Sequence, residues 1–477
     1  MSSLSPSSVQ EVDQEILELT RKRKRLEEIE IEETKRKKIP WIELGDTFYD
    51  KKEYYSATKM YSYAIEYGYT ICKARLYDLG KVWKNKLKDN KEAFQWYLRG
   101  AKQNGHKSQF EVAYMYDTGT GVEVNFEQAF KWYKKSADNG IASSQYKLAM
   151  IYDNGRGVQS DIHKAIEYYK KVAENGILDA FSSLGYIYMD GHVDDSDANI
   201  IIRKNTKEAM VWFRNGAKKG GMYSQREMGR AYHYGHGNVK QNYQTAGFWY
   251  RKSAEQGDPV SSCSLGDLYK NGNGVVQSDK NAMKWYGKAA EKGNVTAMYN
   301  LGVVHERNPK GDIDDYSDDD DIIEIRKARL RNAFTWYTKA ANKGCVKSQI
   351  ALGKLYSTDD CCSDMSIQCY TMAAEKGNSE AQYLLANGYI ERKNNEQVVK
   401  WMTMSADKKY SKAQYELGYL YEIGDYGLPI DLPKAIQLYQ ASANKKNVKA
   451  MYKLGHLYET GMYEDILPKN EELAMQW

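Results

Sequence analysis

An internal repeat is the feature that most constrains how this chain can fold. Its first half has a small residue, Leu-Gly four and five positions later and an aromatic residue three positions further on, as in SSCSLGDLY at 261–269. The small residue, the Leu and the aromatic residue fall at i, i+4 and i+8, so they form one stripe of a helix. The Gly beside the Leu removes a side chain, which indicates that a second helix packs closely there.

The second half of the repeat reads Ala, an aromatic pair, a small pair and Gly, as in AMKWYGKAAEKG at 282–293. These residues recur at offsets 0, 3, 4, 7, 8 and 11, which is the spacing of a buried helical stripe, and the final Gly suits a left-handed C-cap. Several copies join the two halves through a Gly-x-Gly-Val turn that ends in a polar residue able to cap the second helix. The repeat therefore predicts a helical hairpin.

The hairpins follow one another along nearly the whole chain. The position equivalent to the Gly of the first half occurs twelve times, at 45, 80, 113, 149, 185, 229, 266, 302, 353, 386, 418 and 455. Two of the intervals are long, which predicts insertions near 190–205 and 307–325. A hairpin cannot bury its apolar face alone, so neighbours must stack into a superhelix with a concave and a convex side. We expect a charged segment, helical or disordered, over 1–39 and a repeat solenoid over 40–477.

The last repeat is expected to be incomplete. The residues from Ala474 to Trp477 match the opening Ala-x-x-Trp of a second helix, and the sequence ends there. The preceding first helix should then leave Leu454 and Tyr458 only partly covered.

These motifs resemble the Sel-1-like repeats, relatives of the tetratricopeptide repeats, whose unit reads A-x-x-x-L-G-x-x-Y, a G-x-G-V turn and A-x-x-W-Y-x-x-A-A-x-x-G. The likeness covers about residue 40 to the end and is strongest over 261–293. It implies an all-α, right-handed superhelical solenoid of about twelve helix-turn-helix repeats that acts as a non-catalytic scaffold or adaptor for other proteins. The composition, rich in Lys, Asn and Tyr with a run of Asp, is also similar to that of family members encoded by giant DNA viruses of amoebae.

Composition and charge limit the function further. The net charge of +5 is small for 477 residues, so nucleic acid is not expected as a partner. No stretch approaches the roughly 20 apolar residues that cross a bilayer, and residues 1–10 lack the pattern of a signal peptide. We therefore expect an intracellular protein without membrane contact, in the cytoplasm rather than the nucleus. No catalytic triad or carboxylate pair can be nominated, so we expect no catalytic residue, no cofactor and no small-molecule substrate.

Two charged segments have alternative interpretations. The basic clusters Arg21–Arg25 and Lys35–Lys38 can be a bipartite nuclear-import signal, which would suit a nuclear, nucleic-acid-associated protein, or they can belong to a solvated charged helix. The acidic stretch at 311–324 has Ser317 where a calcium-binding loop needs Gly, so we expect a disordered loop there.

The cysteines do not indicate a metal site. Cys361, Cys362 and Cys369 lack the spacing of zinc ligands, and the six cysteines of the chain fall at different positions of the repeat. We therefore expect no bound metal and reduced thiols.

The candidate binding residues come from the first half of the repeat. In the related tetratricopeptide solenoids the first helices line the concave side, and the residues directly after the Gly and directly after the aromatic residue point inward. The candidates for partner binding are Tyr114, Asp117, Asp153, Tyr186, Arg230, His233, Asp267, Lys270, Lys354, Tyr419, Glu422 and His456. Simple solvent exposure is the alternative for each, because only a minority of surface residues carry binding energy.

Overall fold

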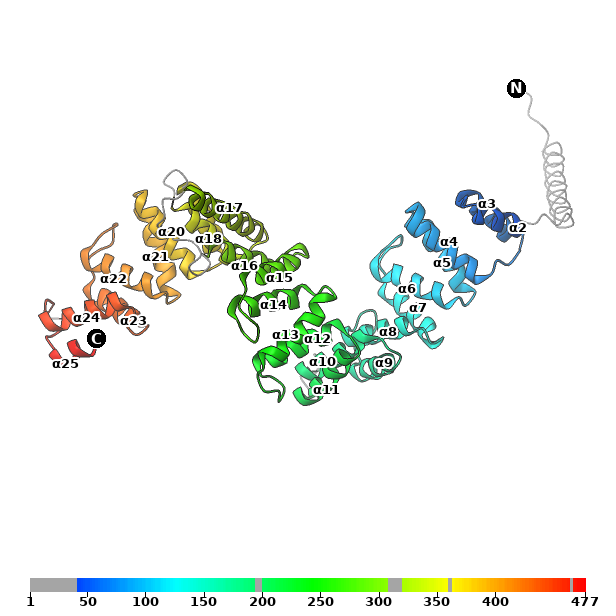
Figure 1. Cartoon of the computed structure of the whole chain (residues 1–477), viewed down its shortest axis with the longest axis horizontal. Helices are drawn as coiled ribbons and strands as arrows, with labels where there is room; N and C mark the ends of the chain where they lie inside the picture. Colours follow the sequence, from blue (N-terminus) through cyan, green and yellow to red (C-terminus); the bar gives the residue numbers. More distant parts are fainter. Residues whose placement is uncertain (1–40, 194–199, 308–319, 359–362, 464–465) are drawn as a thin grey trace, which may run out of the picture. The chain divides into compact units, whose positions relative to one another are not determined.

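The computed structural model describes residues 41–193, 200–307, 320–358, 363–463 and 466–477 (Figure 1). The two basic clusters, most of the acidic stretch, Cys361 and Cys362 lie outside the described residues. The chain divides into two compact units, Met1–Trp212 and Phe213–Trp477, and each is described by itself. Twelve helix pairs make up nearly all of the described part, so the predicted all-α repeat architecture is confirmed.

The first helix of each pair contains the Leu-Gly motif or its equivalent positions, and most second helices contain the aromatic pair or a single aromatic residue of it. The first helices are α2 (Trp41–Asp50), α4 (Lys73–Val82), α6 (His106–Thr118), α8 (Ala142–Asn154), α10 (Leu178–Asp190), α12 (Met222–Tyr234), α14 (Pro259–Asn271), α16 (Val295–Glu306), α18 (Val346–Tyr356), α20 (Ser379–Glu391), α22 (Ser411–Ile423) and α24 (Val448–Thr460). The second helices are α3 (Tyr54–Glu66), α5 (Asn90–Lys102), α7 (Phe126–Asp138), α9 (Ile162–Glu174), α11 (Thr206–Lys218), α13 (Tyr243–Glu255), α15 (Asp279–Glu291), α17 (Asp320–Asn342), α19 (Ser363–Glu375), α21 (Asn395–Asp407), α23 (Leu432–Ala443) and α25 (Glu471–Gln476). A π-helical segment, η1 (Trp83–Leu87), continues α4.

Helices that follow one another in the chain also pack against one another. Most second helices contact the first helix of their own pair and the first helix of the next pair, as α13 does with α12 and α14. Such contacts give a hairpin a neighbour for its apolar face, which is how a repeat solenoid builds a continuous core.

The Gly of the first helix receives the buried Tyr of the second helix. A Cβ atom added to Gly266 would lie 2.6 Å from ring atoms of Tyr286, whose side chain is fully buried. The same contact joins Gly229 to Tyr250 and Gly418 to Tyr439. The close approach that the sequence predicts at this Gly is therefore present.

The helix boundaries follow from capping. Asn125, Asp161 and Ser278, which end the Gly-rich turns, each accept a hydrogen bond from the backbone N–H three residues further on. These bonds satisfy N–H groups that the first turn of a helix leaves without an internal partner. The glycines that begin the turns, such as Gly155, have a left-handed conformation with φ of 64°, which ends the first helix.

A lysine or glutamine near the end of many second helices reaches back to the preceding repeat. Lys292 Nζ donates to the Gly257 carbonyl at 2.8 Å, and Lys376 Nζ donates to the Gly344 carbonyl at 2.9 Å. Gln256 Nε2 does the same to Gly220 at 3.0 Å. These bonds join the C-terminal ends of successive second helices.

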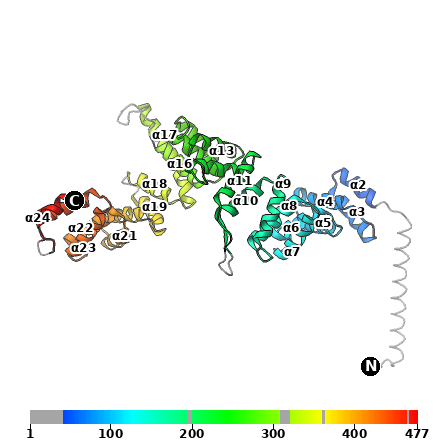
Figure 2. The same cartoon turned by 90° about the horizontal axis from the view of Figure 1, so that it is seen from below.

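Two strands interrupt the helices in the first predicted insertion. The strands are β1 (His192–Val193) and β2 (Ile200–Ile202), which pair antiparallel between α10 and α11 with His192 opposite Ile202 (Figure 2). The side chain of Ile202 packs against the core around Leu184 and Ile187. The repeat pattern did not predict these strands.

The last repeat is better covered than expected. Leu454 is fully buried and Tyr458 is 9% exposed, so the expectation that both would be only partly covered was wrong. The residues after α24 contribute to the same core, with Leu467 buried in it and with Leu473 of α25 and Trp477 packed against it. Asn470 caps α25 by accepting a hydrogen bond from the Leu473 N–H at 2.9 Å.

Candidate functional site

The twelve predicted binding residues lie on first helices, one or four positions after the Gly-equivalent residue. Arg230, Lys354 and Tyr419 are exposed, and the other nine are half-buried. None is part of the hydrophobic core. The first helices of some successive pairs also contact one another directly, α4 with α6 and α14 with both α12 and α16. Side chains of neighbouring repeats can therefore interact across this surface, which we call the first-helix face.

Three of the predicted carboxylates hold the buried Tyr of their own hairpin. The hydroxyl of Tyr169 donates to Asp153 at 3.3 Å, that of Tyr286 to Asp267 at 2.6 Å and that of Tyr439 to Glu422 at 2.7 Å. Such a bond satisfies a polar atom that would be costly to bury alone. Asp153, Asp267 and Glu422 therefore have a structural role in addition to any role in binding.

Sequence reasoning missed two further carboxylates of this kind. Asp46 accepts from the Tyr61 hydroxyl and Glu306 accepts from the Tyr337 hydroxyl, both at 2.5 Å. Asp46 follows its Gly by one position and Glu306 by four, the same two positions as the predicted residues. The available signal was an acidic residue at either position in a repeat whose second helix carries the Tyr.

Tyr133 is an exception to this pairing. Its hydroxyl is buried and has no hydrogen-bond partner. Burial is the main cause of the raised pKa of this phenol, and the negative charge of the nearby Asp117 adds to it. Asp117 pairs instead with Arg156 of the next repeat, at 3.4 Å. An acidic residue at the right position therefore does not ensure the bond to the Tyr.

Several predicted residues also bridge to the next repeat. Asp267 accepts a hydrogen bond from Asn300 Nδ2 at 3.0 Å. Lys354 forms an ion pair with Glu380 at 2.7 Å, and the hydrogen bond from this ammonium group raises its pKa. These contacts join neighbouring first helices. Sequence reasoning missed the partners, because each lies 26 or 33 residues further along the chain.

Glu422 is the centre of one such bridge. Its side chain is only 7% exposed, and Oε1 accepts from Lys453 Nζ at 2.9 Å and from the Tyr463 hydroxyl at 3.0 Å. Burial alone would raise the pKa of this carboxyl, but the hydrogen bonds from Tyr439 and Lys453 outweigh it and hold the pKa below its usual value. Glu422 is therefore ionised and ties together the last two repeats.

Cations lie over aromatic rings on the same face. Lys84 Nζ is 5.1 Å and Lys147 Nζ 6.0 Å from the ring centroid of Tyr114, so cations of both the preceding and the following repeat lie near this ring. Lys449 lies over Tyr415 in the same way, at 5.8 Å. These contacts join adjacent repeats without using backbone groups.

The α12 part of the face is more strongly charged. Arg230 pairs with Glu227 at 3.2 Å, and Arg226 bridges Glu227 and Asp258 at 3.1 and 3.3 Å. One turn further on, burial lowers the pKa of His233, whose ring makes an edge contact with Tyr243 at 5.3 Å. His233 is therefore a neutral, packed side chain near neutral pH.

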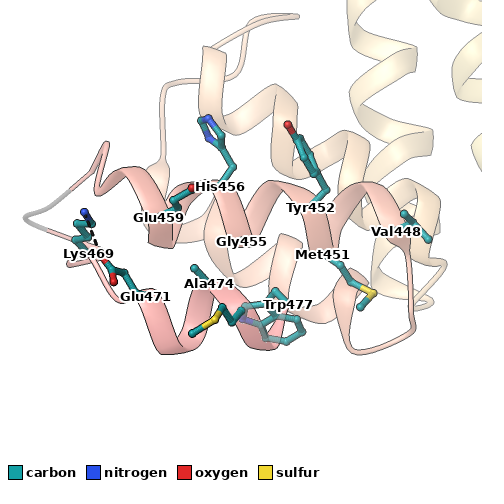
Figure 3. A pocket seen from close by; sticks show the side chains of 11 residues that line it. Val448, Met451, Tyr452, Gly455, His456, Glu459, Lys469, Glu471, Ala474 and Trp477 are labelled. Carbon is teal, nitrogen blue, oxygen red and sulfur yellow. Dashed lines mark ion pairs between the residues drawn. The ribbon is translucent and has the colours of Figure 1, made fainter.

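Two predicted residues line hollows. Asp117 lines a hollow of about 350 Å³ with Lys147 and Arg156. His456 lines one of about 740 Å³ between α24 and α25, together with Tyr452 and Gly455 (Figure 3). Gly455 is equivalent to the glycines that receive the Tyr of the second helix, so the larger hollow belongs to the packing of the last repeat.

The other predicted residues contribute different side chains to the face. Tyr186 and Lys270 are half-buried, and Tyr419 is 42% exposed.

Among the described residues, no group of three or more His, Cys, Asp or Glu side chains is arranged to hold a metal ion, and no helix is long and apolar enough to span a membrane. The four described cysteines are free thiols, and burial raises the pKa of Cys263 to about 12.

The stacked helix pairs define the class of this protein, an all-α repeat solenoid. Eleven segments match the Sel1 repeat model, and together they cover more than half of the chain. The matched residues are 74–105, 106–141, 142–177, 182–221, 223–258, 259–294, 330–345, 363–378, 379–410, 411–447 and 448–477. The chain belongs to the Sel1 repeat family.

Solved structures with the same repeat are similar to this chain. One is c5321, a protective antigen present in uropathogenic Escherichia coli strains and displaying an SLR fold, with 27% sequence identity, coverage of 94% of both chains and a TM-score of 0.63. Another is a Sel1 repeat protein from Oxalobacter formigenes, with 28% identity, coverage of 56% of this chain and 96% of that chain, and a TM-score of 0.43. No curated protein matches the chain.

Proposed function

We propose that this protein is a non-catalytic scaffold that binds other proteins on its first-helix face. The observation that carries the proposal is that this face presents polar and aromatic side chains, at least partly exposed, at the same two positions of successive repeats. Solenoids use such extended surfaces to bind partners, because the repeats can place many side chains along one bound chain. Membership in the Sel1 repeat family is consistent with this role.

The exposed residues of the face are the best candidates for contact with a partner. Arg230 and Tyr419 are of the types that dominate binding energy in protein interfaces. Lys354 adds a charge whose ion pair with Glu380 is exposed to solvent and therefore worth little. A partner can replace that pair without leaving a buried charge unpaired. By contrast, if a partner drew Asp267 or Glu422 away, a buried Tyr hydroxyl would be left without its hydrogen bond.

Quantitative co-purification from the source cell tests the proposal. The chain with Arg230→Ala, Lys354→Ala and Tyr419→Ala should lose at least one protein partner that the unchanged chain retains, by about tenfold or more. A matched control replaces three exposed residues of second helices, Phe248, Lys252 and Lys288, with Ala. Equal recovery with both variants, no reproducible protein partner, or recovery of RNA or DNA alone would contradict the proposal.

A further inference from the structure

The Gly-x-Gly-Val turns fill a groove between neighbouring repeats. A Cβ atom added to Gly157 would lie 2.5 Å from the carbonyl carbon of Phe126, so the turn touches the backbone at the start of the preceding second helix. The next residue, Val158, packs in one cluster with Phe130 of that helix and Ile151 of its own first helix. The turn therefore places a branched aliphatic side chain in the groove from a backbone that only Gly allows so close.

The same contact recurs in other regular repeats. Gly274 lies against the backbone at Tyr243, and Val275 packs with Leu268. Val122 belongs to one cluster with Phe94 and Met115, and Phe94 is only 5% exposed. An aliphatic side chain from the turn thus completes the core at this place.

The connections after α18 and after α20 lack this turn, and a hollow lies beside each at the place where the turn packs in a regular repeat. The segment 357–362 joins α18 to α19 without Gly, and only Arg392–Asn394 joins α20 to α21. The first hollow, about 660 Å³, lies between α17 and α18, and the second, about 360 Å³, between α19 and α20.

The first hollow corresponds residue by residue to the filled groove. Leu330 and Phe334 of α17 occupy the positions of Phe126 and Phe130, and Leu355 of α18 occupies the position of Ile151. Leu330 is 40% exposed and Phe334 is half-buried. The apolar walls that normally hold the Val of the turn are therefore accessible here.

We propose that this hollow is a docking site for an extended segment of another protein that carries Gly followed by a branched aliphatic residue and an acidic residue. The aliphatic side chain would contact Leu330, Phe334 and Leu355, as the Val of a turn does in a regular repeat. The acidic residue would pair with the two cations that line the hollow, Lys327 and Arg331, whose side chains are 60% and 69% exposed. Both pair with Glu324 in exposed ion pairs, which are weak enough to be exchanged.

This docking site is separate from the first-helix face, because it lies on the second helix α17 and the C-terminal end of α18. An experiment that disproves partner binding at the first-helix face would therefore leave this docking site untested, and an experiment that disproves this docking site would leave binding at the first-helix face untested.

A labelled peptide with the sequence of one regular turn, TGTGVEVN (118–125), provides the probe. Fluorescence anisotropy with the full-length chain should show saturable binding. A peptide with Val122→Ser should bind at least about fivefold more weakly, because it loses most of the apolar contact. A peptide with Glu123→Lys should also bind at least about fivefold more weakly at low salt, because it meets Lys327 and Arg331 with a like charge.

Variants of the protein locate the site. Leu330→Asp should lower the affinity for the unchanged peptide at least about fivefold. Phe248→Asp, at a residue 53% exposed on α13, should leave this affinity within about twofold of its original value. Leu330 is partly exposed, so its replacement should not disturb folding, and the two altered peptides test the proposal on the unchanged protein. The absence of saturable binding, or a loss of less than fivefold with either altered peptide or with Leu330→Asp, would overturn the proposal.

Discussion

The close contact between Gly266 and Tyr286 predicts a large and local effect of a side chain at position 266. An added Cβ would lie 2.6 Å from Cδ1 and Cε1 of a fully buried ring, well inside the usual van der Waals separation. The ring cannot move into solvent, so α14 and α15 must separate. Overpacking of this kind costs about 1 to 3 kcal/mol. We expect Gly266→Leu at the upper end of this range and Gly266→Ala near the lower end, because Ala113 and Ala149 occupy the equivalent position in two other repeats.

Gly287 supplies the matched control. It lies in the partner helix α15, and a Cβ added there would meet nothing within 4 Å. Gly287→Ala should therefore show only the gain in helix propensity, about 1 kcal/mol of added stability. Gly266→Ala receives the same gain but also the clash, so subtracting one variant from the other isolates the packing cost.

Thermal melting and amide hydrogen exchange measure the effect. A difference of about 1 kcal/mol between the two Ala variants corresponds to roughly 2 to 4 °C in melting temperature for a unit of this size. The loss of exchange protection should concentrate in α14 and α15. If Gly266→Leu melted like the unchanged protein, or if Gly287→Ala lost as much stability as Gly266→Ala, the close-packing explanation would be refuted.

Three further predictions concern single contacts. The lowered pKa of Glu422 means that its stabilising effect is present above pH about 4.5 and is lost as the pH falls through the folded-state value, so Glu422→Gln should flatten the acid loss of stability in the last repeats, measured by denaturation against pH. Lys292→Met should cost about 0.5 kcal/mol through the lost bond to Gly257, and Lys284→Met on the same helix should cost less, which paired urea titrations would detect. Asp161→Ala should cost about 1 kcal/mol as a lost helix cap, while Asp161→Asn should retain most of the stability; equal losses in both variants would argue against the cap.

Much of the fold could be predicted because the residue pattern within each repeat indicates how its two helices pack. Ser261, Leu265 and Tyr269 are spaced so that helix geometry alone brings them to one face. The same holds for the turn caps Asn125 and Asp161, whose partners lie three residues away. Signals of this range need no knowledge of the tertiary structure.

The candidate site was predicted less completely, because its contacts join different repeats. The role of Asp267 depends on Asn300, and that of Glu422 depends on Lys453, a full repeat further along the chain. No local pattern distinguishes these carboxylates from Asp117, which pairs with Arg156 and leaves the Tyr133 hydroxyl alone. The hollow beside Phe334, by contrast, had a signal in the sequence, since the segment after α18 lacks the Gly-x-Gly-Val turn.

Site-specific photocrosslinking tests the central claim, that partner proteins bind on the first-helix face, most directly. A photoreactive amino acid would replace Tyr419, which is 42% exposed on first helix α22, or Phe248, which is 53% exposed on second helix α13. In extracts of the source cell, irradiation should give a discrete protein adduct from position 419 and none from position 248. Adducts from position 248 alone, or equally from both positions, would contradict binding on the first-helix face.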